Sequence, residues 1–328
     1  MMSKQQSRIF HASNGVNVGY KYKASKYDYN HILFVFSGFG RDRPDHYNFT
    51  NTLDYYPAHV IWVNDNFEDF FTYYMCINLD FQIADAVGEF LKAKTEELNV
   101  PWENITLLGG SKGGSAALYH GLRWDIKNIV ACVPQIKIGT FLDDEKPFTE
   151  KTAVHMMGKH YSQLQIHRLD KVIVELLKKD KELNKNIYLL TSEYDDQYKK
   201  YLANYLDDFK KYKNFNLMKT YSAFVTHHGQ ITEHHLSLVL GILYCLASEG
   251  VPTFPNKEIN FFGSQPVGNK QPTFEPYLDL HQLEYKNERL FIQGIGLLRG
   301  VACPTYNDIH YILIFKSESG TIIEKGLS

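Results

Sequence analysis

The chain has little cysteine, almost no net charge and no long apolar run. Its 328 residues carry 35 Lys and Arg against 37 Asp and Glu, which leaves a formal net charge of −2 at pH 7. This balance provides no overall field that would attract nucleic acid or a membrane surface. No stretch approaches the roughly 20 apolar residues of a transmembrane helix, and the polar start at residues 1–8 is unlike a secretory signal. We expect a cytoplasmic protein, with peripheral attachment at the inner face of the membrane as the alternative.

The cysteines are few and far apart. Cys76, Cys132, Cys245 and Cys303 form no C-x-x-C pair, and three of them lie in apolar or aromatic stretches. Such spacing is typical of reduced thiols in a core rather than of disulfides or metal ligands. We therefore expect no metal site and no tightly bound cofactor.

Apolar residues are abundant but are divided into short segments. Hydrophobic residues make up 44% of the chain and aromatic residues 14%, which is ample for a core. Continuous apolar runs are typical of strands buried on both faces, and an amphipathic helical pattern covers residues 80–98. The alternation predicts a mostly parallel, doubly wound α/β sheet. The apolar runs lie at residues 31–37, 59–63, 105–108, 129–134, 187–191 and 216–221, the last of which we expect to be the final strand.

The composition predicts two domains of unequal size. We assign residues 1–250 to the α/β domain, with a helical insertion at about 135–185 that could cap an active site. Pro, Gly, Asn and Gln are frequent over 251–276, which predicts a linker. Residues 277–328 show short β runs with turns near 287, 308 and 320, and we expect a small β-sandwich-like domain there. Whether that domain is complete stays open, because about fifty residues form only a thin sheet with exposed edges.

A serine lies in a sharp turn between a strand and a helix. Gly109, Ser111 and Gly113 form a Gly-x-Ser-x-Gly motif directly after the apolar run 105–108. Such a turn holds the serine hydroxyl above the sheet edge, at the N-terminus of the next helix. Because a serine hydroxyl is a weak nucleophile, it requires a base, an acid that orients the base, and donors for an oxyanion.

The acid is expected after a later strand. On an α/β-hydrolase sheet the chain order is Ser, then Asp or Glu, then His. Asp195 is our first choice, since it lies four residues past the strand at 187–191, with Asp196 second and Glu193 third. The alternative is that Asp195 or Asp196 only caps the following helix.

The base is expected in the segment before the closing helix. His228 precedes Gly229 and is our choice for a loop histidine directed at Ser111, with His227 as its rival. His234 and His235 lie further on, inside the predicted helix, and we interpret them as structural.

Two backbone N–H groups are candidates for the oxyanion hole. One belongs to Lys112, directly after the serine, and the other to Phe39 in the loop after the first central strand. Gly38 would let the main chain approach the substrate closely, although an ordinary tight turn explains the same residues. Arg41, Arg43 and Lys112 are candidates for contacts with phosphate groups of a substrate, against the alternative that the arginines are simply solvated.

Four segments together resemble a known group of proteins. They are the elbow at 109–114, the Ser-Gly-Phe-Gly loop at 37–40, the acid segment at 192–197 and the His-His-Gly-Gln-Ile segment at 227–231. The resemblance covers about residues 30–248 and is to the α/β-hydrolase-fold proteins of bacterial capsule and cell-surface polysaccharide biosynthesis. That group includes capsule O-acetyltransferases and an accessory secretion component that acts on sugars.

The resemblance implies a Ser111–His228–Asp195 triad, acetyl-CoA as acyl donor and a polysaccharide or oligosaccharide hydroxyl as acceptor. Capsule-assembly proteins are further implied partners. The lysine after the serine is common to the group and does not separate a transferase from an esterase. Two alternatives stay open: a carbohydrate esterase or deacetylase with the same triad, and a non-catalytic glycan-binding or assembly component in which the C-terminal β region does the work.

Overall fold

A nine-stranded sheet forms the centre of the computed structural model, which describes residues 7–40, 46–220, 227–254, 258–261, 276–298 and 311–327. The strand order is β1-β2-β4-β3-β5-β6-β7-β8-β9. The first two strands, β1 (Arg8–His11) and β2 (Asn17–Lys23), form an antiparallel hairpin at the edge, and β2 pairs antiparallel with β4. All further pairs are parallel, so the predicted doubly wound sheet is confirmed. The parallel strands are β3 (Ile32–Phe36), β4 (His59–Val63), β5 (Ile105–Gly110), β6 (Asn128–Cys132), β7 (Asn186–Ser192), β8 (Asn214–Thr220) and β9 (Glu258–Phe261).

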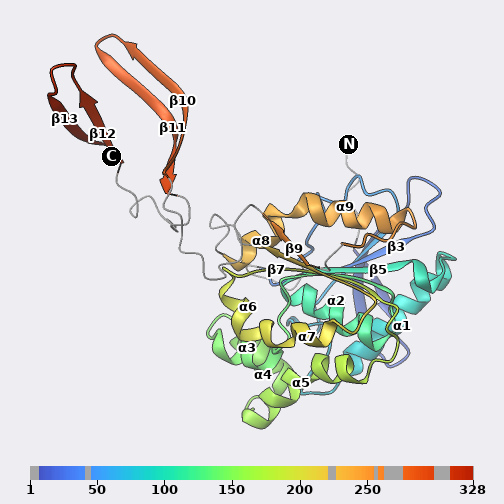
Figure 1. The fold of residues 1–328 in the computed structure, drawn as a ribbon. Coiled ribbons are helices and arrows are strands. Elements are labelled where there is room, and N and C mark those ends of the chain that lie inside the picture. Colours follow the sequence, from blue (N-terminus) through green and yellow to red (C-terminus); the bar gives the residue numbers. More distant parts are fainter. Residues whose placement is uncertain are drawn as a thin grey trace.

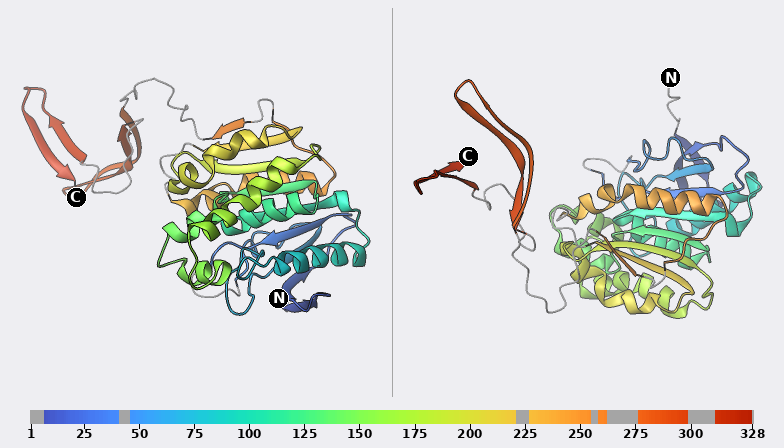
Figure 2. Two further views of the ribbon diagram at one scale, coloured as in Figure 1. Left: turned by 90° about the horizontal axis from the view of Figure 1, so that it is seen from below. Right: turned by 45° about the horizontal axis from the view of Figure 1, so that its top comes forward.

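Helices cover both faces of this sheet, which explains why its strands are continuous apolar runs. In β3, Ile32, Phe34 and Phe36 face the core on the side of α1, α2 and α5, whereas Leu33 and Val35 face the core on the side of α9. Figures 1 and 2 show these helices on opposite sides of the sheet. A strand buried on both faces has no polar side to present, so its sequence does not alternate. The helices are α1 (Gln82–Glu97), α2 (Lys112–Arg123), α3 (Ile138–Asp144), α4 (Glu150–Met157), α5 (Gln163–Lys179), α6 (Asp196–Tyr201), α7 (Leu206–Phe209), α8 (His228–His234) and α9 (Leu236–Ala247), with short 3-10 turns η1 (Trp102–Asn104) and η2 (Ala203–Tyr205).

The insertion between β6 and β7 contains three helices, and they differ in function within the fold. On α5, Leu169, Ile173 and Leu177 are buried in the core that also contains α2, so this helix is the crossover that covers the sheet. α3 and α4 precede it. Phe141 of α3 and Phe148, between α3 and α4, have ring centroids 6.2 and 5.3 Å from that of Phe39. This first part of the predicted insertion therefore adjoins the loop after β3.

The prediction that the apolar run at 216–221 is the final strand of the sheet is wrong. β9 (Glu258–Phe261) pairs parallel with β8 and lies inside the segment 251–276 that the composition marked as a linker. The strand is only four residues long and lies at the sheet edge. Because Pro, Gly and Asn residues surround it, the sequence pattern of this segment is not that of a strand.

Beyond the α/β sheet, the described residues form two antiparallel hairpins. β10 (Pro276–Lys286) pairs with β11 (Arg289–Leu298), and β12 (Tyr311–Lys316) pairs with β13 (Ile322–Leu327). Asn287 and Glu288 have φ of 52° and 58°, as expected of a tight hairpin turn, and Gly320 in the second turn has φ of 87°. Two of the three predicted turns are thus confirmed, and the third, near residue 308, lies outside the described residues.

The two hairpins are separate two-stranded sheets, as Figures 1 and 2 show. Every residue of β10 is exposed, and large apolar side chains such as Leu278, Leu283 and Ile314 are among those in contact with solvent. The described residues therefore contain the predicted antiparallel β structure without the packed layers of a sandwich.

His31 and His120 are buried in the core, and each is hydrogen-bonded to a neutral group. His120 on α2 has its Nε2 2.9 Å from the carbonyl oxygen of Tyr74, and its ring stacks on Phe36. Burial lowers the pKa of His120 from 6.5 to about 3, and burial lowers the pKa of His31 to about 4. Both imidazoles are therefore neutral in the folded protein at neutral pH.

We predict that His120→Gln makes the stability less sensitive to acid. Between pH 6.5 and about pH 3 the unfolded chain binds a proton at His120 and the folded chain does not. The free energy of unfolding therefore decreases as the pH is lowered through this range, by up to about 1.4 kcal/mol per pH unit from this side chain. Urea unfolding at pH 7 and pH 5 measures the difference. His167→Gln, at an exposed position of α5, should keep the wild-type pH dependence, and an equally steep fall in His120→Gln would contradict the prediction.

Candidate active site

The segments that follow β3, β5, β6 and β7 meet at the carboxyl edge of the sheet. Ligands bind at this edge in open α/β folds. Ser111 follows β5, Asp195 follows β7, and His228 is the first residue of α8. The structure brings these three predicted residues into one hydrogen-bonded chain.

Ser111 occupies a strained backbone conformation between β5 and α2. Its φ is 54° and its ψ is −124°, and its N–H donates to the carbonyl oxygen of Cys132 at 2.8 Å. Glycine is required on both sides: a Cβ at Gly109 would lie 2.0 Å from the carbonyl oxygen of Gly113, and a Cβ at Gly113 would lie 2.1 Å from that of Phe36. A non-glycine residue at positive φ costs about 1–3 kcal/mol and persists where the surroundings enforce it. The packing of the two glycines therefore fixes the direction of the serine side chain.

His228 links the serine to a carboxylate. Its Nε2 is 2.8 Å from Ser111 Oγ, and its Nδ1 is 2.9 Å from Asp195 Oδ2. Asp195 is 3% exposed, and its other oxygen, Oδ1, accepts the backbone N–H of Gln197 at 3.0 Å. With the Nδ1 proton directed at the carboxylate, Nε2 accepts the serine hydroxyl proton. Asp195 also caps α6, so the two interpretations of this aspartate are compatible.

The side chains of the alternatives to Asp195 and His228 have other environments. Asp196 and His227 are exposed, and Glu193 pairs with Lys219 at 2.9 Å. His228 begins helix α8 and is not a loop residue, which corrects the predicted helix start. Of the two later histidines, His234 ends α8, and His235, between α8 and α9, is buried with its Nδ1 2.6 Å from the carbonyl oxygen of Ile231.

Gln135 contacts the serine and was missed by the sequence analysis. Its Nε2 donates to Ser111 Oγ at 3.0 Å and to Gln197 Oε1 at 2.8 Å. A signal was present, because Gln135 is the first polar residue after β6, and its place after a strand corresponds to that of Asp195 after β7. It belongs to no recognised motif, however.

The Lys112 side chain points into the protein. It is 0% exposed, and its Nζ lies 2.6 Å from Asp65 Oδ2. The rings of Phe71 and Tyr74 lie around the ammonium, with centroids 4.9 and 4.5 Å from Nζ. Burial lowers the pKa of Lys112, and the Asp65 carboxylate opposes that shift. The predicted contact between the Lys112 ammonium and substrate phosphates is therefore wrong, because a sequence does not reveal which way a lysine side chain turns.

Asp65, also missed from the sequence, organises the aromatic segment after β4. Its carboxylate accepts the backbone N–H groups of Thr72, Tyr73 and Tyr74 at 3.0–3.2 Å. The segment packs inward: the Phe71 ring centroid is 5.0 Å from that of Phe39. This favours packing over the alternative that the segment lines a pocket. It also connects the Lys112–Asp65 ion pair to the loop after β3.

The loop after β3 approaches the elbow closely. A Cβ at Gly38 would lie 3.1 Å from the carbonyl oxygen of Gly110, and the Gly38 N–H donates to Asn48 Oδ1 at 2.6 Å. Phe39 comes directly after Gly38 in this loop. Lys112 is the first residue of α2, so the Lys112 N–H has no acceptor within the helix. Arg41 and Arg43, predicted to bind substrate, lie outside the described residues.

The cysteines lie in different environments. Cys76 and Cys132 are buried, and burial raises the pKa of each thiol to about 12, which makes them unreactive. Cys245 is exposed, so the prediction of a core position is wrong for it. Cys303 lies outside the described residues.

Among the described residues, no group of three or more His, Cys, Asp or Glu side chains could hold a metal ion. In the same part of the chain, no helix has the length and apolar character needed to cross a bilayer.

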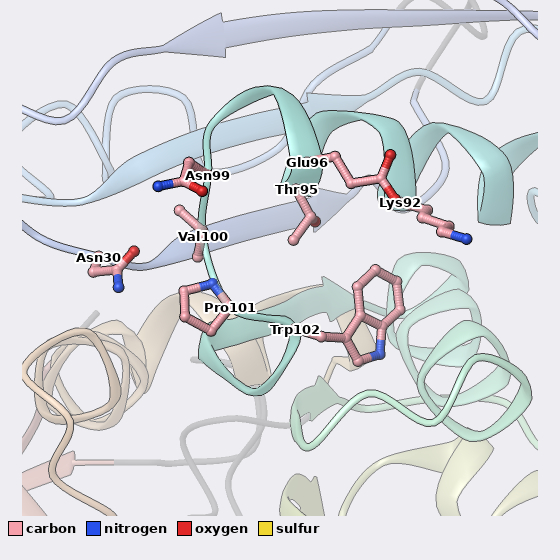
Figure 3. A pocket seen from close by; sticks show the side chains of 8 residues that line it. All are labelled: Asn30, Lys92, Thr95, Glu96, Asn99, Val100, Pro101 and Trp102. Carbon is pink, nitrogen blue, oxygen red and sulfur yellow. The ribbon is translucent and has the colours of Figure 1, made fainter.

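A surface pocket lies at the opposite edge of the sheet. It is lined by residues at the end of α1 and before β5, including Lys92, Glu96 and Trp102, as Figure 3 shows. Asn30, ahead of β3, completes it. The pocket therefore lies at the amino ends of the strands, and its lining residues include no serine–histidine pair. The carboxyl edge is therefore the candidate active site.

Comparisons with solved structures identify the fold. A capsule O-acetyltransferase of Neisseria meningitidis serogroup A has a TM-score of 0.57 at 18% identity, covering 71% of this chain and 98% of that chain. A mutant of that enzyme in complex with CoA has a TM-score of 0.56 at 18% identity, covering 72% and 94%.

Serine hydrolases and esterases are also similar. A fluorophosphonate-binding serine hydrolase of Staphylococcus aureus has a TM-score of 0.53 at 10% identity, covering 73% of this chain and 98% of that chain. An acetyl xylan esterase from Paenibacillus sp. R4 has a TM-score of 0.51 at 11% identity, covering 72% and 82%. No protein-family model and no curated protein sequence matches the chain. The chain has the α/β-hydrolase fold.

We predict that Lys112→Met destabilises the protein strongly. The substitution leaves the Asp65 carboxylate buried without its cation, which costs about 3–5 kcal/mol of the free energy of unfolding. The double variant Lys112→Met/Asp65→Asn removes both charges and should recover part of that loss. Denaturant unfolding of the three proteins measures both effects.

Lys179→Met is the matched control, because Lys179 pairs with Glu175 at 3.1 Å on the surface of α5. Its cost should stay below about 1 kcal/mol. A Lys112→Met variant as stable as this control would show that the buried ion pair contributes nothing.

Proposed function

We propose that the chain is a serine-dependent acyltransferase that moves an acetyl group from acetyl-CoA to a hydroxyl of a bacterial capsular or cell-surface polysaccharide. The observation that carries the proposal is the hydrogen-bonded chain from Ser111 Oγ through His228 to Asp195, with distances of 2.8 and 2.9 Å. These are the distances at which an imidazole accepts a serine proton and a carboxylate orients the imidazole.

In the first half-reaction, Ser111 Oγ attacks the thioester carbonyl carbon while His228 Nε2 takes the hydroxyl proton. The C–S bond then breaks, and the CoA sulfur leaves with the proton from His228. Asp195 stabilises the transient imidazolium. The backbone N–H groups of Phe39 and Lys112 donate to the carbonyl oxygen as it becomes negative.

In the second half-reaction, a sugar hydroxyl gives its proton to His228 and attacks the acetyl carbon. The bond between that carbon and Ser111 Oγ breaks, and His228 returns the proton to Oγ. Transfer prevails over hydrolysis where the acceptor is held in place and water is excluded. Phe141 and Phe148 pack on the ring of Phe39, and this apolar packing supports the loop that carries one of the proposed oxyanion donors.

The choice of donor and acceptor has two supports. The similar fold of a capsule O-acetyltransferase, one structure of which contains CoA, favours acetyl-CoA and a capsular glycan. The four sequence segments that resemble capsule biosynthesis proteins include all three residues of the proposed triad. An acyl-CoA donor also agrees with the cytoplasmic location that the sequence predicts, and capsule-assembly proteins are the partners that this function implies.

A carbohydrate esterase is the second candidate. The similar fold of an acetyl xylan esterase favours it, and the chemistry up to the acyl-enzyme is shared. Water then replaces the sugar hydroxyl in the second half-reaction.

We predict that, beyond the single equivalent of CoA released when Ser111 is acetylated, the wild type turns over acetyl-CoA only when capsular oligosaccharide is present, and that the sugar becomes acetylated. Ser111→Ala and His228→Ala should each lower the rate by about 10⁴-fold or more, because the nucleophile and its base act as a unit. Asp195→Asn should lower it by about 10⁴-fold through loss of the required tautomer. A thiol assay follows CoA, and mass spectrometry follows the acetylated sugar.

Asp196→Asn is the matched control, since Asp196 is exposed beside Asp195 and should retain wild-type activity. Continuous CoA release over many turnovers without any acceptor argues against the transferase. Turnover of an acetylated glycan without CoA supports the esterase. Full biological function of Ser111→Ala would favour the non-catalytic component.

A further inference from the structure

Gln135 is held rigidly beside the serine. Its side chain is fully buried, and its backbone N–H donates to Ser115 Oγ at 2.9 Å. The Ser115 hydroxyl in turn donates to the Gln135 carbonyl oxygen at 2.8 Å. The Ser115 side chain on α2 thus hydrogen-bonds both the N–H and the carbonyl group of Gln135. The backbone of Gln135 is therefore fixed, and its side-chain amide is held in position next to Ser111.

The Gln135 amide completes a closed ring of hydrogen bonds. Its Nε2 donates to Ser111 Oγ and to Gln197 Oε1, and the Gln197 backbone N–H donates to Asp195. Asp195 Oδ2 accepts a hydrogen bond from His228 Nδ1, and His228 Nε2 is hydrogen-bonded to Ser111 Oγ. Both hydrogens of the amide nitrogen therefore have acceptors, and the orientation of the amide is determined.

This ring determines the direction of the serine proton. A serine hydroxyl has one proton and two lone pairs, whereas an amide nitrogen is a donor only. Because Gln135 Nε2 donates to Ser111 Oγ, the oxygen accepts there and its own proton is free to point to His228 Nε2. Gln135 Nε2 lies 3.5 Å from His228 Nε2, which is farther than either is from Ser111 Oγ.

We propose that Gln135 is a further catalytic residue, which donates a hydrogen bond to Ser111 Oγ whenever that oxygen carries negative charge. The inference rests on the proposed acyl-transfer function. Charge develops on Oγ twice: when His228 removes its proton as the bond to the acyl carbon forms, and when that bond breaks and Oγ leaves before His228 reprotonates it. A donor preorganised on the reacting oxygen lowers both barriers.

Removing the donor tests the proposal. Gln135→Met keeps the length of the side chain without N–H groups, and Gln135→Glu places a carboxylate against Oγ. The rate constant for labelling of Ser111 by a fluorophosphonate probe should fall about 10- to 100-fold in Gln135→Met. It should fall further in Gln135→Glu. In the acetyl-transfer assay the loss should be in kcat, with KM within about twofold of the wild type, because the contact is strongest in the transition state.

Two controls separate catalysis from packing. Gln82→Met makes the same chemical change at an exposed position of α1 and should label at the wild-type rate. Gln197→Met removes the second acceptor of the amide without touching Ser111, so its effect on the labelling rate should be smaller than that of Gln135→Met. Thermal unfolding shows whether each variant is folded, and Gln135→Glu serves if Gln135→Met does not fold.

The possible results have distinct meanings. A folded Gln135→Met or Gln135→Glu variant that labels as fast as the wild type overturns the role of Gln135 and leaves the proposed function intact. A wild type that labels at Ser111 but transfers no acetyl group overturns the acetyltransferase, while the labelling rates still decide the role of Gln135. A wild type whose Ser111 does not react with the probe at all overturns both.

Discussion

The close packing of α2 against two strands is the constraint on which the rest of the site depends. Gly113 lies against the carbonyl oxygen of Phe36 at the end of β3, and a Cβ at Gly114 would be 2.7 Å from that of Cys132 at the end of β6. No larger residue fits at either position. The contact forces Ser111 to positive φ and brings the start of α2 to the point where the loops after β3, β6 and β7 converge.

A buried ion pair extends this constraint away from the serine. Lys112 follows Ser111 directly, so its bond to Asp65 ties the elbow to the end of β4. Asp65 in turn accepts N–H groups of the segment whose Phe71 packs on Phe39. The two proposed oxyanion donors, the N–H groups of Phe39 and Lys112, are therefore positioned by one charged contact. A buried ion pair adds little net stability against an apolar replacement, but losing one partner is costly. Its value here is in specifying one arrangement of the loop.

The sequence predicts those features that depend on chain order and periodicity. Continuous apolar runs predict the buried parallel strands, and polar residues that follow them predict Ser111, Asp195 and His228. It does not predict contacts that depend on side-chain direction. The sequence shows that residue 112 is a lysine, but it does not show whether the ammonium is solvated or buried. Nor does it identify Asp65 as the partner of that ammonium. Gln135 follows a strand as Asp195 does, yet an amide there matches no catalytic motif. The short strand β9 was hidden because four residues among Pro and Gly carry too little periodicity.

On the proposed function, the triad itself does not favour transfer over hydrolysis, because His228 deprotonates a sugar hydroxyl or a water in the same way. The hydrogen-bond ring through Gln135 does not favour either reaction, since it acts on the serine oxygen in both. Selectivity must then arise from what borders the acyl group. Phe39, whose N–H is a proposed oxyanion donor, packs with its ring on Phe141 and Phe148, so the α3–α4 segment supports the loop that carries this donor. A polymer hydroxyl, unlike water, can also be held by contacts elsewhere along the glycan. The loop after β3 and the α3–α4 segment, rather than the triad, are therefore where an esterase and a transferase of this fold would differ.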